Sequence, residues 1–442
     1  MGVTIPTTRG LGSLRETFDR DPTEYYDAIR ELGPVVWDED EEVWLVAGYR
    51  ALRELTLADK VAWVDPIFRG ACDPRFRAFG VPIDQWLTYT GGPTVLQQTE
   101  NEVHSRQHRW WMRALSPKVL KRWGDEIVDP IYGQALAELA PRGKADLSAE
   151  FLQFAVLKAQ FSVLGVPTDD EWIARFSELA PRLLAIFGSK MLHLDPARNS
   201  AEDEDVLMSL EASGALREMV AEVARGKRQA LMTSSEADAA GIDFIGLLWS
   251  GGEDLFVSGE PTVQDVVGHA WMGIAGVESA VGGAQSLSYL LAKHPELHDR
   301  IRDDERAADA FVEETTRLYG ANEFRFRRAL RDIELAGIPI KEGQMAVALI
   351  ASANRDPEHY SNAAEIDLDR TAPRDHFGFF QGPRSCVGMS IARLHLQRLV
   401  RKMLEHLGEL RLDIDAPPPR YRGSQLRHWD PLHVIFTDRK AQ

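Results

Sequence analysis

The sequence predicts a mainly α-helical fold with a small β part, and three observations lead to this prediction. Apolar residues recur at three- and four-residue spacing along most of the chain, which is the period of an amphipathic helix. Two-residue alternation is confined to a few short stretches. The segment 262–292 follows the helical period throughout, and at about 1.5 Å per residue it would extend roughly 45 Å, the width of a domain. We expect it to form a long central helix.

The individual elements follow from these two periods. The helical pattern is clearest at 23–32, 104–122, 127–139, 148–164, 170–187, 205–232, 262–292, 307–318 and 388–407. Strand patterns predict a hairpin of 34–37 with 42–47, a second pair of 332–340 with 344–351, and a last strand at 432–436.

The expected central helix contains four glycines, at Gly273, Gly276, Gly282 and Gly283. Each costs about 1 kcal/mol relative to Ala inside a helix. Close approach of a flat ligand to the helix backbone would explain why they are there.

Size and charge limit the classes of protein to which the chain can belong. With 442 residues, 44% of them hydrophobic, it can bury a large core. We find no Gly/Ser-rich linker and no repeat in the sequence, so we expect one domain over 1–442. The net charge of −17 repels nucleic-acid phosphates and excludes a general nucleic-acid binder.

The sequence gives no sign of a membrane segment or of a disulfide framework. Its first residues contain no long apolar run, and the apolar stretch 270–292 is interrupted by Glu278 and Gln285, so we expect no membrane span. The two cysteines, Cys72 and Cys386, fit a reducing cytoplasm, and we expect that location. Cys72 is interpreted as structural.

The strongest chemical signal is the segment 379–388, which presents Cys386 on a Gly/Pro-rich turn directly before an amphipathic helix. The positive end of that helix favours a thiolate, and N–H groups of the turn can donate to the sulfur. These features indicate a metal ligand. The alternative is a buried free cysteine at a helix start.

This segment resembles the haem-binding loop of cytochromes P-450, whose pattern is FxxGxRxCxG. All five fixed positions match, at Phe379, Gly382, Arg384, Cys386 and Gly388. Phe380 departs from the family, because many members have Gly there. The resemblance implies heme b (iron protoporphyrin IX) with Cys386 as the thiolate ligand and Arg384 on a propionate. It also implies the family's fold, a helical prism with a long central helix and a small β lobe.

Further motifs of the family follow in the expected order. Glu314 and Arg317 resemble its buried ExxR pair, with Arg370 as the third partner, and we interpret all three as holding the fold rather than as catalytic. Arg327 matches a position that binds a haem propionate in the family. Its alternative role is that of a solvated charge on a strand.

His104 and His108 resemble the HxxxR helix with which the family grips the haem propionates, except that His108 replaces the Arg. A neutral histidine still donates a hydrogen bond but holds a carboxylate less firmly. Two histidines at this spacing could also form part of a metal site, although no acidic third ligand lies nearby in the sequence.

The segment 275–279 resembles the family's oxygen-activating AGxET motif. The resemblance implies that Ala275 and Gly276 lie beside the haem, and that Gly276 opens a groove in the helix. It assigns Glu278 and Ser279 to an acid–alcohol pair that delivers protons while dioxygen is activated. Serine stands where threonine is usual and lacks the methyl that restricts the rotamer, so we expect more peroxide leakage.

A monooxygenase of this family needs electrons from outside. We see no flavin or nicotinamide fingerprint in the sequence, so the resemblance implies a separate ferredoxin or flavodoxin, with NAD(P)H used only indirectly. Between residues 104 and 124 the chain has four Arg and two Lys and neither Asp nor Glu. This basic stretch is either a docking surface for an acidic partner or a solvated helix face.

The substrate is expected to be a lipophilic small molecule of natural-product type. Positions that line the family's distal pocket match mostly apolar residues, at Trp86, Leu87, Phe187, Ile274, Val277, Phe324 and Trp429, each of which could instead be a core residue. Glu323 or Arg325 could pair with a polar group. The alternatives to a dioxygen-using enzyme are a peroxide-using peroxygenase and a non-catalytic haem-binding or sensing protein. The Glu278–Ser279 pair argues against both.

Overall fold

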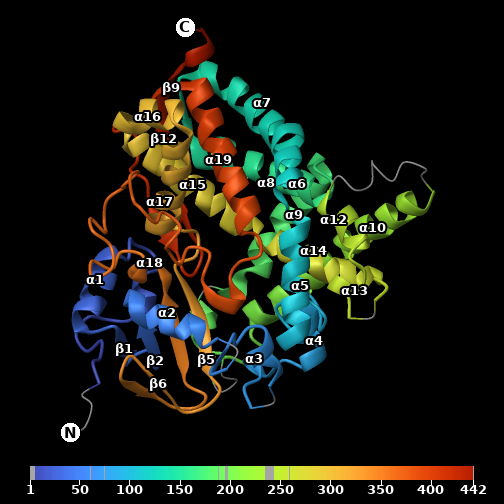
Figure 1. Ribbon diagram of the computed structural model, residues 1–442, viewed down its shortest axis with the longest axis vertical. Coiled ribbons are helices and arrows are strands. Elements are labelled where there is room, and N and C mark those ends of the chain that lie inside the picture. The colour runs from blue at the N-terminus through green and yellow to red at the C-terminus, as the bar shows by residue number, and fades with distance from the viewer. Residues whose placement is uncertain are drawn as a thin grey trace. The chain divides into compact units, whose positions relative to one another are not determined.

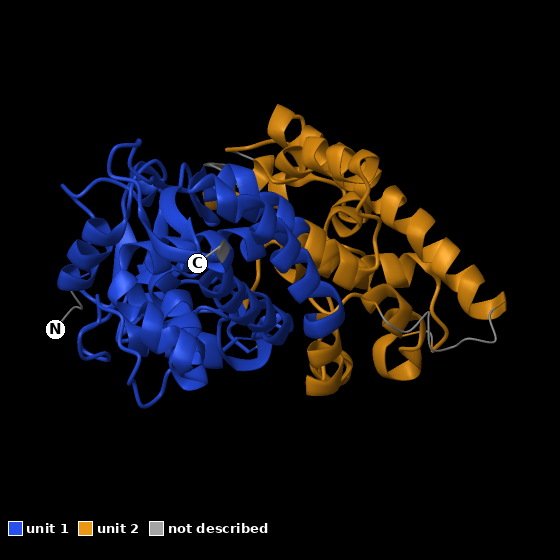
Figure 2. Ribbon diagram, turned by 90° about the horizontal axis from the view of Figure 1, so that it is seen from above, with its two compact units in different colours: residues 1–63, 124–157, 278–442 blue, residues 64–123, 158–277 orange. Residues whose placement is uncertain are grey.

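The computed structural model describes residues 5–59, 61–73, 75–187, 189–194, 198–233, 243–257 and 259–441. The chain divides into two compact units (Figure 2). The first unit comprises residues 1–63, 124–157 and 278–442, and the second comprises 64–123 and 158–277. Both units are discontinuous in sequence, so the chain passes between them several times. That residues 1–442 fold as one domain stays a prediction.

The main sheet of the first unit is built on the predicted hairpin. Strands β1 (Val35–Asp38) and β2 (Val43–Val46) pair antiparallel, which confirms that prediction. Strand β8 (Met345–Leu349), buried along its whole length, pairs parallel with β2 and antiparallel with β5 (Phe324–Ala329). The sheet order β1-β2-β8-β5 therefore joins segments some 300 residues apart.

The second predicted strand pair is wrong in its partners. The stretch 332–340 is itself a hairpin, of β6 (Ile333–Leu335) and β7 (Ile338–Ile340). Ala336 and Gly337 between them both have positive φ, of 49° and 81°, as a two-residue hairpin turn requires. The stretch 344–351 instead contributes β8 to the main sheet.

Two smaller sheets complete the β part of the first unit. One has the order β4-β12-β9, formed by Lys144–Asp146, His433–Asp438 and Leu407–Leu412. β12 confirms the strand predicted at 432–436. The other pairs β10 (Tyr421–Gly423) with β11 (Arg427–Trp429). β3 (Trp63–Val64) lies where the chain leaves the first unit.

Helices dominate both units, as the sequence predicts (Figure 1). The first unit contains α1 (Thr23–Leu32), α2 (Tyr49–Leu57), α7 (Asp129–Leu139), α16 (His298–Asp303), α17 (Glu305–Tyr319), α18 (Ile350–Ala353) and α19 (Met389–His406). The second contains α3 (Arg69–Cys72), α4 (Ile83–Tyr89), α5 (Asn101–Ala114), α6 (Pro117–Trp123), α9 (Asp170–Leu183), α10 (Glu204–Thr233), α12 (Phe244–Trp249), α13 (Gly252–Leu255) and α14 (Val263–Ala275). Helices α8 (Gln153–Leu164) and α15 (Val277–Lys293) cross the boundaries of the units.

Two predicted helices are each divided in the structure. The stretch 104–122 breaks at Leu115, whose ψ of 42° is not helical, and Pro117 then begins α6, where its missing N–H costs nothing. The expected central helix is interrupted at Gly276, so that α14 ends at Ala275 and α15 begins at Val277.

The protein itself accounts for two of the glycines in this segment. A Cβ placed on Gly282 would lie 2.8 Å from the carbonyl oxygen of Arg427 on β11, and one on Gly273 would lie 2.4 Å from a methyl carbon of Leu164. Close approach of protein groups therefore requires these glycines, where we had expected a flat ligand. Among the described residues, no helix is both long enough and apolar enough to cross a membrane.

Candidate functional site

The cysteine loop of the first unit connects the main sheet region to α19. Cys386 follows a short 3-10 turn, Gly382–Arg384, and its N–H donates to the carbonyl oxygen of Phe379 at 2.9 Å. Gly382 has a φ of 78°, and a Cβ there would lie 2.5 Å from the carbonyl oxygen of Thr56 on α2. Only glycine combines this φ with this contact, so Gly382 fixes the turn against α2.

Phe380 also has a left-handed conformation, with a φ of 55°. This explains why glycine is usual at the position in the family that the loop resembles. The left-handed region costs roughly 1–2 kcal/mol for a residue with a Cβ. The guanidinium of Arg327 lies 4.6 Å from the centre of the Phe380 ring, and this cation–π contact offsets part of that cost.

The surroundings of Cys386 act on its thiol in opposite directions. Desolvation by the surrounding protein raises the pKa of the thiol, although the cysteine is exposed to solvent. The Gly388 N–H hydrogen bond and the positive charges of Arg325 and Arg393 act in the opposite direction and favour the thiolate. Gly388 leads into α19, so the positive end of that helix faces the turn, as the sequence predicts. This donor set fits a haem-thiolate ligand.

A second acid holds the cysteine loop to α17, and sequence reasoning missed it. Glu313 accepts from Arg393 at 2.7 and 3.0 Å and lies 3.0 Å from Nε2 of His376. Arg393 in turn lies 4.5 Å from the centre of the Phe379 ring. Burial raises the pKa of Glu313, but the hydrogen bonds from His376 and Arg393 outweigh it and lower the pKa to about 2. Glu313 directly precedes Glu314 in the sequence, and this adjacency is the signal that could have identified it.

The predicted cluster of Glu314, Arg317 and Arg370 is confirmed as a structural unit. Glu314 accepts two 2.8 Å hydrogen bonds from Arg317 and a 3.0 Å bond from Arg370. Arg317 also donates to the carbonyl oxygens of Asn354, Ala363 and Glu365. The side chains of Glu314 and Arg317 are fully buried, so the cluster joins α17 to the loop before the cysteine.

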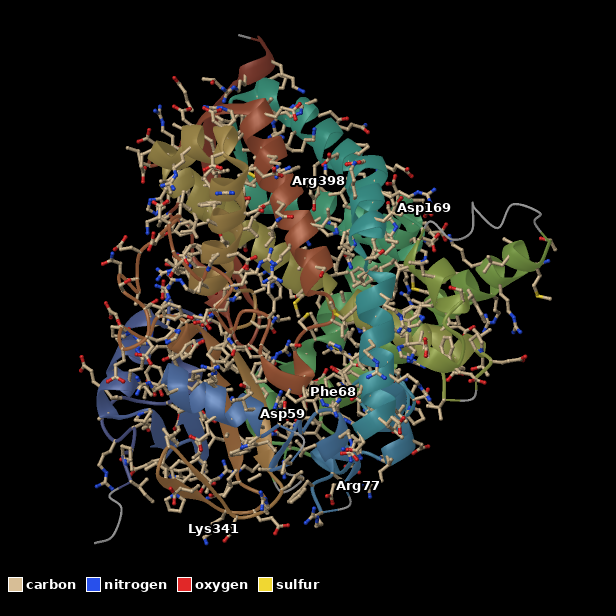
Figure 3. The ribbon with its side chains drawn as sticks, in the orientation of Figure 1. Asp59, Phe68, Arg77, Asp169, Lys341 and Arg398 are labelled. Atoms are coloured by element: carbon tan, nitrogen blue, oxygen red, sulfur yellow. The ribbon has the colours of Figure 1, made fainter. Side chains whose placement is uncertain are left out.

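Helix α19, which carries the loop, is anchored by a second charged contact (Figure 3). Arg398 donates to Asp129 of α7 at 2.7 Å and to Asp125 at 2.9 Å. The two helices run side by side in Figure 1. These bonds hold the middle of α19 to α7 and to the turn before it.

Arg327 on β5 is not the solvated charge that the sequence allowed as its alternative. It is buried and donates to Asp59, which lies after α2 (Figure 3), at 2.9 and 3.1 Å. The partner is 268 residues away, so the sequence alone could not reveal it. A role for Arg327 with a haem propionate stays a prediction, and Asp59 would compete for the guanidinium.

The acid of the predicted acid–alcohol pair is half-buried on α15. Burial raises the pKa of Glu278, and its carboxylate lies 3.9 Å from Nε2 of His428. Ser279 follows on the same helix. Both residues belong to the first unit with Cys386, whereas Ala275 and Gly276, at the end of α14, belong to the second. The roles of all four stay predictions.

His104 and His108 lie one turn apart on α5 of the second unit, with ring centres 5.9 Å apart. Gln107 between them is buried and donates to the carbonyl oxygens of Thr94 and Leu255. These two hydrogen bonds fix the orientation of the α5 face that carries Gln107. Within the described part of the chain, no three side chains of His, Cys, Asp or Glu form a group that could hold a metal ion. The alternative of a metal site on this helix therefore finds no third ligand among the residues that the structure describes.

The predicted pocket residues divide by unit and by burial. In the second unit Trp86, Ile274 and Val277 are buried and Leu87 is half-buried. In the first unit Phe324 is buried, and Trp429 stacks on Tyr289 with 3.6 Å between ring centres. The side chains of Phe187 and Cys72 lie outside the described residues. Burial favours the core alternative for the tryptophans, and contact with a substrate stays a prediction.

Glu323 is buried among the C-terminal strands, and one oxygen of its carboxylate is hydrogen-bonded there. It accepts from the Tyr421 hydroxyl at 2.5 Å and lies 4.0 Å from the guanidinium of Arg427. Burial raises its pKa. Its contacts assign Glu323 to the packing of the C-terminal strands.

Comparisons with known proteins agree with this geometry. The family model "Cytochrome P450", written P-450 here, matches residues 270–432, which include the cysteine loop and the ExxR pair. The P-450 monooxygenase PikC of Streptomyces venezuelae is 26% identical over 450 residues, covering 95% of this chain and 93% of the relative. The chain belongs to the cytochrome P-450 family. The mycinamicin IV hydroxylase/epoxidase of Micromonospora griseorubida, which is 27% identical, covers 90% of each chain.

The fold agrees with that of solved P-450 structures. The P-450 CYP109Q5 from Chondromyces apiculatus superposes with a TM-score of 0.75 at 19% identity, covering 96% of this chain and 97% of the other. As a P-450, the chain is a haem-thiolate monooxygenase whose cofactor is heme b. Cys386 is the cysteine that matches the ligand position of the family's pattern.

Proposed function

We propose that this P-450 inserts one oxygen atom of dioxygen into a lipophilic small molecule of natural-product type, with electrons supplied by a separate ferredoxin or flavodoxin. The observation that carries the proposal is Cys386, presented directly before α19 by a turn that its N–H closes on the Phe379 carbonyl oxygen, with the Gly388 N–H and two arginines near its sulfur. When bound, the haem supplies the activation of dioxygen, which its thiolate ligand promotes. The protein supplies the ligand, the positioning and the protons.

The residues of the site divide these tasks. Cys386 would hold the iron, and Arg384 and His104 would hold the propionates. Glu278, whose pKa burial raises, would donate a proton to the Ser279 hydroxyl. Such positioned proton delivery is what a dioxygen-using enzyme needs and a peroxide-using one does not, so Glu278 favours the first over a peroxygenase or a sensing protein.

The basic stretch on α5 and α6 supports an acidic electron donor. Five of its six cations are exposed to solvent, at Arg109, Arg113, Lys118, Lys121 and Arg122. Arg113 pairs with Asp254 of α13, which weakens its share of the positive field. On a chain with a net charge of −17, such a surface would steer a small acidic protein toward this face.

The first experiment is the absorption spectrum of the dithionite-reduced protein under carbon monoxide, for the wild type and for Cys386→Ala. We expect a strongly red-shifted Soret band that is lost in the variant. A band typical of imidazole ligation, or identical spectra for the two proteins, would contradict the ligand assignment.

A second experiment separates the proposed function from its alternatives. We expect dioxygen consumption with a surrogate ferredoxin, its reductase and NADPH, and negligible product from a panel of lipophilic substrates with hydrogen peroxide alone. Turnover with peroxide alone would indicate a peroxygenase, and no consumption under either condition would indicate a binding or sensing protein.

A further inference from the structure

Three polar side chains of the first unit form a line that ends at Glu278. Nδ1 of His428, on β11, lies 3.0 Å from Oε1 of Gln285 on α15. Nε2 of Gln285 donates to the hydroxyl of Ser148, in the π-helical turn Ser148–Leu152. Nε2 of His428 lies 3.9 Å from the carboxylate of Glu278, which precedes Gln285 by about two turns of the same helix. Among the described residues, His428 is the only basic side chain within ion-pair distance of Glu278.

The fold brings β11 onto α15 at this point and holds it there. Gly282, between Glu278 and Gln285, leaves the space that the Arg427 carbonyl oxygen occupies. The buried Arg427 side chain donates to the carbonyl oxygens of Arg20 and Thr17, at 2.7 and 2.9 Å. The contacts of the neighbouring Arg427 therefore hold the backbone before His428 in place, and the His428 ring faces α15.

The hydrogen bonds determine which ring nitrogen carries the proton. Gln285 uses its NH₂ group on Ser148, so its carbonyl oxygen faces His428 and can only accept. Nδ1 of His428 must then be the N–H. In the neutral ring Nε2 is therefore the acceptor, and it is the nitrogen that faces Glu278. A carboxyl group and a proton-accepting nitrogen thus face each other.

We propose that His428 is the positioning residue and proton partner of Glu278, and that the two side chains share one proton, directly or through one water. This inference rests on the proposed function, because it concerns the acid that supplies protons for oxygen activation. When Glu278 gives that proton to the Ser279 hydroxyl side, its carboxylate is left beside the neutral His428 ring. Nε2 of His428 then takes a proton from solvent, to which 29% of its side chain is exposed, and passes it to the carboxylate, so that both side chains return to their starting state.

The electrostatics of the pair are consistent with easy proton exchange. Burial raises the pKa of Glu278 and lowers the pKa of His428, so the two values approach each other. Asp430 raises the pKa of His428, and Arg422, which is opposite His428 in the β10–β11 pair, binds Asp430 at 2.5 Å.

The chain provides a matched control. His294 lies 2.9 Å from Glu296 at the end of α15, so it forms another histidine–carboxylate pair in the same unit. That Glu296 side chain is 63% exposed, and the contact does not involve Glu278. His294→Asn therefore removes a histidine–carboxylate pair without touching the proposed one.

The first test reads the pair without turnover. Histidine side chains labelled with ¹³C and ¹⁵N are titrated in the reduced, carbon monoxide-bound holoenzyme, with His428 assigned from His428→Asn. We expect the Nδ1–H tautomer in the wild type and its loss in Gln285→Leu. In Glu278→Gln we expect the pKa of His428 to fall by about one unit, because the neighbouring anion is removed. An unchanged His428 titration in Glu278→Gln would overturn the proposal.

The second test measures the consequence for oxygen chemistry. Dioxygen consumed and hydrogen peroxide formed are measured against pH, with a surrogate ferredoxin, its reductase and NADPH. In His428→Asn, which keeps a polar group near Gln285 but lacks Nε2, we expect the fraction of dioxygen lost as peroxide to rise by roughly 2–10-fold. We also expect its pH dependence to flatten. His294→Asn should match the wild type in both respects.

The outcomes separate this inference from the proposed function. If the wild type lacks the red-shifted carbon monoxide band or consumes no dioxygen, the proposed function fails, and the titration still reports whether the two side chains are coupled. If the band and the consumption are normal in all variants and His428→Asn leaks no more peroxide than His294→Asn, the role of His428 is wrong. Should His428→Asn not fold, His428→Gln provides the same comparison.

Discussion

The buried cluster of Glu314, Arg317 and Arg370 predicts a large effect of a single, nearly isosteric substitution. Glu314→Gln keeps the volume of the side chain and removes its charge. Both Arg317 and Arg370 then lose their counter-ion, and the side chain of Arg317 is fully buried. The backbone N–H of Asp367, which donates to Glu314 at 2.9 Å, also loses a charged acceptor.

The size of the effect follows from burial. Removing one partner of a buried ion pair costs about 3–5 kcal/mol, because the remaining charge is left uncompensated in a medium that solvates it poorly. The three carbonyl oxygens that Arg317 also contacts can take up part of that charge. We therefore expect a loss near the lower end, about 3 kcal/mol of the free energy of unfolding.

The control lies on the same helix. Glu305 pairs with Arg401 at 2.7 Å, but its side chain is 78% exposed. Glu305→Gln should change the free energy of unfolding by less than about 0.5 kcal/mol. The measurement is equilibrium urea unfolding of the holoenzyme, followed by circular dichroism and by the Soret band. If the two variants unfold at the same urea concentration, the cluster does not stabilise the fold as a buried ion pair.

Three further predictions concern the loop and the strand that contacts α15. Charged partners depress the pKa of Glu313 to about 2, so the stability that Glu313 contributes should be complete above roughly pH 4.5 and should be lost as the pH falls toward 2. In Glu313→Gln, unfolding measured between pH 6 and 3 should lose that part of its acid dependence. Gly382→Ala places a Cβ 2.5 Å from the Thr56 carbonyl oxygen at a φ of 78°, so we expect less haem bound per protein and a weaker carbon monoxide band. As a control, Gly337→Ala in an exposed turn should leave the band intact. Gly282→Ala should displace β11 and lower the melting temperature by several degrees, since its Cβ meets the Arg427 carbonyl oxygen at 2.8 Å.

Local patterns predicted most helices and the first hairpin correctly, because those elements are defined by the spacing of their own apolar residues. Contacts between distant segments were not predictable in this way. Strand β5 contains three arginines in six residues and reads as a polar segment, yet Asp59 neutralises the buried Arg327 from 268 residues away. The stretch 344–351 was assigned to the wrong neighbour because its true partners, β2 and β5, are selected by tertiary packing.

The candidate site shows the same division. The motif around Cys386 is local, so the sequence predicts the ligand together with the turn that presents it, and the structure shows that turn. The partner of Glu278 is not local, since His428 lies 150 residues further along the chain and its neighbours in sequence give no hint of it. Gly282 was noticed for its cost in a helix, but only the structure shows that it admits the Arg427 carbonyl group.

Helix α17 shows how two adjacent residues can hold the cysteine loop through two different sets of contacts. Glu313 binds Arg393 and His376, which flank the cysteine turn, and Glu314 binds Arg317 and Arg370 before it. Successive helix positions point about 100° apart, so one turn of α17 can hold the cysteine loop from two sides. Loss of either acid should therefore loosen the same loop by a different route. Their combined loss should exceed the sum of the single effects if the two anchors support one common geometry, and fall short of it if one anchor alone is sufficient.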